Sequence, residues 1–239
     1  GTGMENHSKY GDTIFFHNTD ALWVNLFIAS ELTWSEKDVS VRQETRFPES
    51  DTTTLKISTD HPVQFALKIR HPDWAVDGVK VWLNDRTQKT ESAPGSYFTI
   101  DREWNNGDTV KIQLPMRLHT ENLPDTTNDV ALLFGPIVLA GELGTNDLPN
   151  LFVGNQTEYS FLPDPPAPVL VCGADQWLKH VKPVSVSPLT FRTHGIGRPQ
   201  DVTLKPFYQI HRQRYAVYWQ LLSEAGWKAH AKELAAAEA

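Results

Sequence analysis

The chain has 239 residues, of which 40% are hydrophobic and 21% are charged, and its formal net charge is −7 at pH 7. This composition is typical of a globular protein rather than a disordered one, and the length suffices for one large or two ordinary domains. No apolar run approaches the roughly 20 residues of a membrane helix, and no block of Lys and Arg offers a surface for phosphates. The sequence therefore predicts no membrane span and no nucleic-acid partner.

The first residues form a short polar segment ahead of a β-rich body. Gly1 is not a translation start, and the glycines around it fit a flexible turn rather than a secretory signal, which needs an apolar core. Two interpretations stay open for residues 1–19. They are the remnant of an upstream active-site domain, or they are a solvated N-terminal tail.

From Thr13 onward the pattern is that of β-strands. Residues 39–47 and 63–69 alternate apolar and polar side chains with a period of two, which separates a buried face from a solvated one. In the second of these strands we expect Phe65 to face the core, because a slip of one residue would bury Lys68 and Arg70. Further strands are expected at 55–57, 79–83, 97–100 and 110–114.

Turn residues separate these strands at short intervals. Asn105 to Asp108 form a hairpin-type turn, because Asn and Gly tolerate positive φ. Residues 130–141 are apolar almost throughout, and we interpret them as one strand buried on both faces, with Gly135 and Pro136 as a bulge or bend. The pattern predicts an all-β fold in which residues 20–143 form one antiparallel β-sandwich.

The composition changes after Gly144. Residues 146–150 and 163–168 are linker-like and rich in proline. Shorter strand candidates follow, so we expect a second, smaller β unit over residues 144–222. A C-terminal helix is expected over 223–239, capped by Ser223 and truncated, since it has no stop signal.

Few residues offer catalytic or metal chemistry. Cys172, the one cysteine, lies in an apolar run and is predicted to pack as a small buried hydrophobe. The histidines have no spacing that places two metal ligands on one face, so neither a metal site nor a cofactor is predicted in this chain. The sequence has no nucleophile elbow and no phosphate loop, and residues 194–198 are interpreted as a loop.

Four residues are candidates for carbohydrate contact. Trp74 and Trp104 lie at loop boundaries, where an exposed ring can stack on a sugar, although a structural role is favoured for them over sugar contact. His211 and Arg214 belong to a polar and aromatic cluster, which is alternatively a strand edge bonded to neighbouring backbone. Trp23 and Trp82 lie within strands, where we expect core packing.

Several motifs, in order, resemble glycoside hydrolase family 127, the β-L-arabinofuranosidase-like proteins. Residues 1–11 resemble the segment after the family's Cys-Cys pair, and residues 23–32 resemble its "YVNLYIPSEL" strand. Three more stretches resemble "RIPxWA", "W-x-x-GD-x-V-x-x-x-LP" and "ALLxGPLVLAG", at residues 69–75, 104–115 and 131–141. Residues 207–219 resemble the "PFYxIHxxRYxxYW" end of larger, Bacteroidetes-type members.

The resemblance implies that the catalytic machinery lies outside this chain. In the family an (α/α)6 barrel holds a cysteine nucleophile on a zinc centre and a glutamate acid/base, all upstream of Gly1. It implies a non-catalytic accessory region that packs on that barrel, with Glu5 and His7 as remnants near the pocket. Zinc would belong to the missing domain. The implied parent is bacterial and periplasmic or secreted, and the missing contacts are made in cis or across a dimer.

Two other functions stay open. A carbohydrate-binding module would show exposed, coplanar aromatic side chains. A self-sufficient glycosidase would need two facing carboxylates in one cleft, and 29 acidic residues do not identify such a pair. The sequence does not select the sugar.

Overall fold

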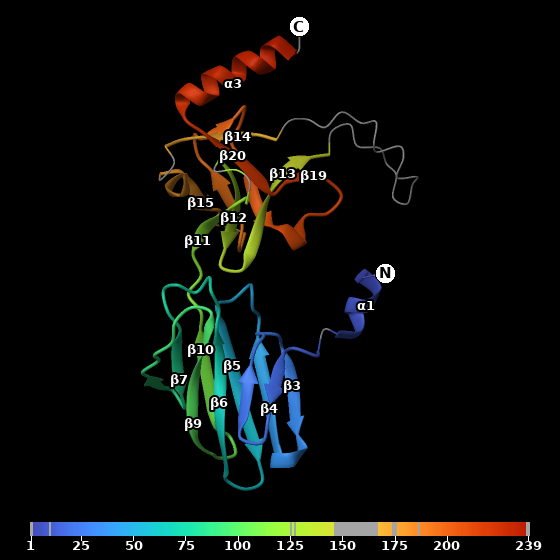
Figure 1. Ribbon diagram of the computed structural model, residues 1–239, viewed down its shortest axis with the longest axis vertical. Helices are drawn as coiled ribbons and strands as arrows, with labels where there is room; N and C mark the ends of the chain where they lie inside the picture. The colour runs from blue at the N-terminus through green and yellow to red at the C-terminus, as the bar shows by residue number, and fades with distance from the viewer. Residues whose placement is uncertain are drawn as a thin grey trace. The chain divides into compact units, whose positions relative to one another are not determined.

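The computed structural model describes residues 2–9, 11–124, 126, 128–145, 167–173, 176–185 and 187–237. The chain divides into two compact units, Gly1–Met116 and Arg117–Ala239, which Figure 1 colours from blue to green and from green to red. In the part of the chain that the structure describes, strands far outnumber helices, so the predicted all-β class is confirmed.

Two sheets make up the first unit. A short helix α1 (Thr2–Asn6) and the turns η1 (His7–Lys9) and η2 (Ser35–Lys37) accompany them. The first sheet has the order β1 (Phe15–His17), β2 (Ala21–Val24), β6 (Val63–His71) and β9 (Ser96–Trp104). The second has the order β3 (Ser30–Trp34), β4 (Val39–Thr45), β5 (Thr52–Thr59), β10 (Thr109–Gln113), β7 (Lys80–Leu83) and β8 (Arg86–Gln88). Neighbouring strands in both sheets are antiparallel, except that β2 and β6 are parallel.

The two sheets enclose one hydrophobic core, to which Leu67 of the first sheet and Ile57 and Ile112 of the second contribute fully buried side chains. Along β6 the predicted alternation is confirmed. Phe65 is 1% exposed, whereas Lys68 and Arg70 are half-exposed on the other face. The period of two therefore fixed the register of this strand, because a slip would have placed two cations in the core.

The turn at residues 105–108 is not a hairpin, contrary to the prediction. It joins β9, which pairs with β6 in the first sheet, to β10, which pairs with β5 and β7 in the second. Asp108 holds this crossing. Its carboxylate accepts hydrogen bonds from the Asn105 backbone N–H at 2.9 Å and the Asn84 side-chain amide at 2.7 Å. Turn chemistry is local, so it does not tell which sheet the next strand joins.

Residues 130–141 form two strands rather than one. β12 (Asp129–Phe134) and β13 (Ile137–Gly144) pair with each other as a hairpin around Gly135, whose φ is 54°. Both also pair with strands of the second unit, so the division between the units falls after Met116 and not after residue 143. An apolar run indicates that a segment is buried, but not in which core. Residues 130–141 contribute to the core of the second unit.

The second unit is built on one large sheet. Its order is β15 (Val181–Pro183), β16 (Phe191–Thr193), β18 (Thr203–Pro206), β13, β12, β20 (Tyr218–Leu222), β14 (Val169–Val171) and β17 (Gly197–Arg198), with β11 (Leu118–Asn122) on β12 and β19 (Arg214–Ala216) on β13. The turns η3 (Trp177–His180) and η4 (Phe207–Gln209) join strands. The helix α3 (Glu224–Ala237) follows, and the Ser223 hydroxyl accepts a hydrogen bond from the Gly226 N–H at 3.0 Å, as predicted for its cap.

The core of the second unit forms around Trp219, which is 1% exposed, and Leu132 and Leu139, which are fully buried. Gly141 lies against this ring. A Cβ at that position would lie 2.8 Å from the Val202 side chain and closer still to the Trp219 ring. Glycine at residue 141 is therefore required by close approach within a strand. The linker-like stretch 146–150, and 163–168 as far as residue 166, lie outside the described residues.

Asp201 organises the loop between β16 and β18. Its carboxylate accepts hydrogen bonds from the Gly195 N–H at 2.7 Å, the Gly197 N–H at 2.9 Å and the Thr193 hydroxyl at 3.0 Å. Burial raises the pKa of Asp201, but these hydrogen bonds lower it by more, so its pKa lies below the ordinary value. The loop predicted at 194–198 is thus present, with β17 as a two-residue strand inside it.

We expect Asp201→Asn to lower the free energy of unfolding by about 1–3 kcal/mol at pH 7, because two backbone donors lose a charged acceptor. A carboxyl with a lowered folded pKa stabilises above its unfolded pKa, near 3.9, and loses that contribution as pH falls through the folded pKa. The difference between variant and parent should therefore shrink below about pH 4. Urea unfolding at pH 7 and pH 3 measures it, with the exposed Glu121→Gln as the control. A difference that does not change with pH would contradict the assignment.

Candidate functional site

Trp104 is a core residue and not a sugar-binding one. It ends β9 with no exposed surface, its indole N–H donates to the Phe65 carbonyl at 3.0 Å, and its ring stacks on Phe65 with centroids 5.4 Å apart. A side chain without exposed surface has no face to offer a sugar, so the structure removes Trp104 from the carbohydrate candidates.

Trp74 retains part of its surface. It lies between β6 and β7, is half-buried, and stacks on Phe47 with centroids 6.1 Å apart and an interplanar angle of 24°. Phe47 covers one face of the ring, and Trp74 packs against the edge of the first core. A carbohydrate role for Trp74 stays a prediction.

His211 and Arg214 lie beside an exposed aromatic cluster in the second unit. His211 is exposed and Arg214 half-exposed. Phe207 and Tyr215 touch, with ring centroids 5.2 Å apart. We call Phe207 and Tyr215, which are 45% and 49% exposed, the aromatic patch. Tyr208 and Tyr218, which are 48% and 54% exposed, lie in the same segment of the chain. The sequence motif located this cluster but did not reveal that its rings are exposed.

An ion pair lies next to the aromatic patch. Glu142, which is directly opposite Tyr215 in the sheet, accepts hydrogen bonds from Lys205 at 2.8 Å and Gln213 at 3.1 Å. Burial raises the pKa of Glu142, and these partners lower it by more, so its pKa lies below the ordinary value. Glu142 is therefore anionic near neutral pH and helps to hold the segment that carries Tyr215.

The other predicted residues are not brought together. Glu5 lies in α1 and His7 in η1, both with exposed side chains. Cys172 is partly rather than fully buried, because it lies at the edge of the second core just after β14. Within the described residues, no group of three or more His, Cys, Asp or Glu side chains is placed to hold a metal ion. No helix in that part of the chain is long and apolar enough to cross a membrane.

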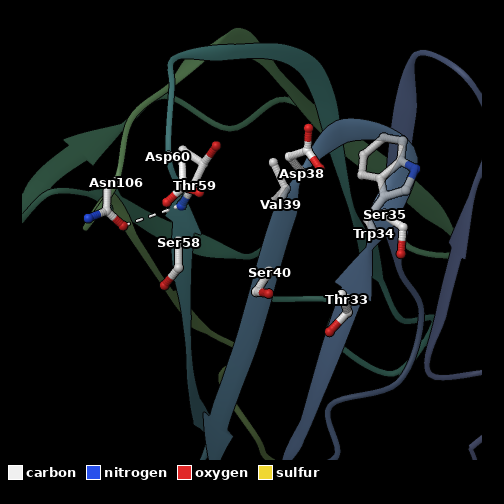
Figure 2. A pocket seen from close by; sticks show the side chains of 10 residues that line it. All are labelled: Thr33, Trp34, Ser35, Asp38, Val39, Ser40, Ser58, Thr59, Asp60 and Asn106. Carbon is white, nitrogen blue, oxygen red and sulfur yellow. Dashed lines mark hydrogen bonds between the residues drawn. The ribbon is translucent and has the colours of Figure 1, made fainter.

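A polar pocket of about 340 Å³ lies at one end of the second sheet of the first unit (Figure 2). Thr33, Ser40 and Ser58 are neighbours across β3, β4 and β5, so their hydroxyls form a row. Asp38 and Asp60 lie beyond this row, at the strand ends. The pocket offers donors and acceptors of hydrogen bonds, which suit a polar ligand or ordered water.

Trp23 and Trp82 differ from the prediction of core packing. Both are half-buried, and a lysine lies over each ring, Lys68 at 4.6 Å from the Trp23 centroid and Lys111 at 5.4 Å from the Trp82 centroid. For Trp23, the alternation of side chains along its strand already indicated an outer-face position. Leu22 and Val24 flank Trp23 and are fully buried, and a period of two then places Trp23 on the outer face.

The comparisons with known families match the two units separately. Residues 21–116 match the family model described as beta-L-arabinofuranosidase, GH127 middle domain, and residues 119–221 match a domain of unknown function. None of the curated proteins matches the chain.

Solved structures of glycoside hydrolases share the fold. Ara127N, a GH127 beta-L-arabinofuranosidase from Geobacillus stearothermophilus T6, is 21% identical with a TM-score of 0.62, over 89% of this chain and 35% of that one. The GH127 beta-arabinofuranosidase BT3674 is 20% identical with a TM-score of 0.63, over 87% and 36%. Another glycoside hydrolase is 18% identical with a TM-score of 0.59, over 87% and 37%.

These matches confirm the predicted resemblance to glycoside hydrolase family 127. The family model covers the sandwich of the first unit almost from end to end. At 18–21% identity the structural matches show the fold alone, and the chain spans about a third of the length of each matched structure.

Proposed function

We propose, from the GH127 middle domain in residues 21–116, that this chain is the non-catalytic β region of a GH127-type glycosidase. In this proposal it packs on a catalytic barrel and stabilises it. One observation carries the proposal: nearly the whole chain shares its fold with about a third of the length of such enzymes. The remaining two thirds would then hold the chemistry.

The chemical requirements of glycoside hydrolysis explain why we assign catalysis to the barrel and not to this chain. A retaining glycosidase needs a nucleophile and an acid/base held about 5 Å apart. By the resemblance, both belong to the barrel, together with the zinc ion that would activate the nucleophilic cysteine. Glu5 and His7 follow the family's nucleophile motif, so we propose that they border the pocket in the parent enzyme. The proposed substrate class is the β-L-arabinofuranosides, in a bacterial enzyme that is periplasmic or secreted.

The aromatic patch is the surface that we propose for contact with the barrel. Its two rings touch and are each about half exposed, and large apolar side chains grouped on a surface usually mark an interaction site. The Glu142 ion pair beside it fixes the segment that presents Tyr215. The contact would be made within one parent chain or across a dimer.

Thermal unfolding of the full-length parent tests this function. We expect the double substitution Phe207→Ser and Tyr215→Ser to lower the melting temperature of the catalytic barrel by several degrees, since about 1 kcal/mol shifts a domain of 150–250 residues by 2–4 °C. Val76→Ser is the control, because Val76 is 48% exposed but lies in the first unit. A barrel that is equally stable and active after removal of this whole region would exclude the proposal.

A further inference from the structure

A hollow of about 400 Å³ lies on the outer face of the first sheet of the first unit. We propose that it binds a neutral sugar, one or two rings in length, through a site formed by Ala21, Trp23, Gln64, Ala66 and Asp101. This binding role is separate from the packing role proposed above, because it needs no catalytic barrel.

The floor of the hollow is apolar because the strands place small side chains side by side. Ala21 of β2 is directly opposite Ala66 of β6, and Ala66 is directly opposite Asp101 of β9. In the neighbouring row, two residues along, Trp23 is opposite Lys68. Two methyl groups thus lie between taller side chains, and side chains two residues apart share one face of a sheet. The depression is a consequence of this register.

Trp23 forms the aromatic wall. Its neighbours Leu22 and Val24 are fully buried in the core, so the ring stands on the opposite, solvent-facing side of the strand. The Lys68 ammonium lies 4.6 Å from the ring centroid. A cation at this distance is attracted by the ring face. The lysine and the indole therefore stabilise each other, and both line the hollow beside the alanine floor.

Polar groups form the opposite wall and the rim. The Gln64 amide donates to the Asp101 carboxylate at 2.6 Å, which fixes both side chains relative to each other. Asp20 lies in the turn that enters β2, and the Asn18 side-chain oxygen accepts hydrogen bonds from the backbone N–H groups of Asp20 and Ala21, both at 2.9 Å. The Gln64 and Asp101 side chains and the backbone of the turn are thus held in place before any ligand arrives.

This combination suits a sugar ring. A sugar has an apolar face of C–H groups and a rim of hydroxyls, so the methyl floor and the indole can contact the face while amide and carboxylate oxygens accept hydroxyl protons. The volume lies in the range of about 300–1,000 Å³ that is usual for small-molecule sites. Two carboxylates, Asp20 and Asp101, against the single Lys68 ammonium disfavour an anionic ligand.

Calorimetric titration of the 239-residue chain with arabinobiose, xylobiose and cellobiose tests the site. We expect at least one of the three to bind at millimolar concentration or tighter. Trp23→Ala should weaken that binding by about tenfold or more, the equivalent of one stacking contact. Trp82→Ala is the matched control, because Trp82 is also a half-buried outer-face tryptophan beneath a lysine, in the other sheet. It should leave the affinity unchanged.

A second variant keeps the test decisive if Trp23→Ala does not fold. Ala66→Leu fills the floor without removing any binding group and should abolish binding. Binding that survives Ala66→Leu, binding that is lost equally in Trp82→Ala, or no binding of any of the three sugars overturns the proposal. Since these measurements use this chain alone, a negative result leaves the proposed packing on a barrel to its own test.

Discussion

Replacing Trp104 by alanine is expected to lower the free energy of unfolding of the first unit by about 3–5 kcal/mol, the range for deleting a large buried aromatic side chain. The side chain has no exposed surface and stacks on Phe65 at the centre of the core. Its loss would leave a cavity and would also remove the donor that satisfies the Phe65 carbonyl. Urea unfolding followed by circular dichroism measures the change.

Two further variants separate burial from other effects. Trp82→Ala removes the same ring from a half-buried position and should cost about 1 kcal/mol or less, as surface changes usually do. Trp104→Phe keeps an aromatic ring but lacks the indole N–H, so it should cost about 1–3 kcal/mol, including the lost hydrogen bond to the Phe65 carbonyl. Equal losses for Trp104→Ala and Trp82→Ala would contradict the assignment of Trp104 to the core.

The chain alone is expected to leave aryl β-L-arabinofuranosides unhydrolysed, with a rate at least on the order of 10³-fold below that of the full-length parent, since loss of a nucleophile costs several orders of magnitude. A nucleophilic thiolate is activated by a metal or a neighbouring cation. Cys172 instead packs against the edge of the second core, and its backbone N–H donates to the Leu222 carbonyl at 3.0 Å. Release of the aryl alcohol measures the rate.

Cys172→Ser provides the control for that experiment. It should change neither the activity of the parent enzyme nor the background rate of the chain alone. In the parent enzyme proposed above, adding the catalytic barrel should restore turnover, and substituting the first cysteine of the Cys-Cys pair that the resemblance implies should abolish turnover again. Hydrolysis by the chain alone that survives Cys172→Ser, but is lost on changing a carboxylate such as Asp60, would place an active site within these 239 residues.

The sequence alone determined many of the strands and, along β6, which face is buried. Along β6, Phe65 and Lys68 could be assigned to opposite faces because side chains alternate in any extended chain. The cap at Ser223 could also be predicted, because a helix start depends on only a few adjacent residues. The family motifs were readable too, because they are ordered strings that need no three-dimensional information.

Only the tertiary structure decided which strands become neighbours. The turn at residues 105–108 does not reveal in its sequence whether the next strand joins the same sheet or another. The apolar run at residues 130–141 likewise does not reveal which strands it pairs with. Trp104 and Trp23 show the consequence for the candidate site. Both tryptophans lie in strands, yet Trp104 is buried in a core, whereas Trp23 lies beside the alanine floor. That floor exists only because β2 and β6 are paired in this register. Local patterns report a residue's own exposure, whereas a site depends on contacts between residues far apart in the chain.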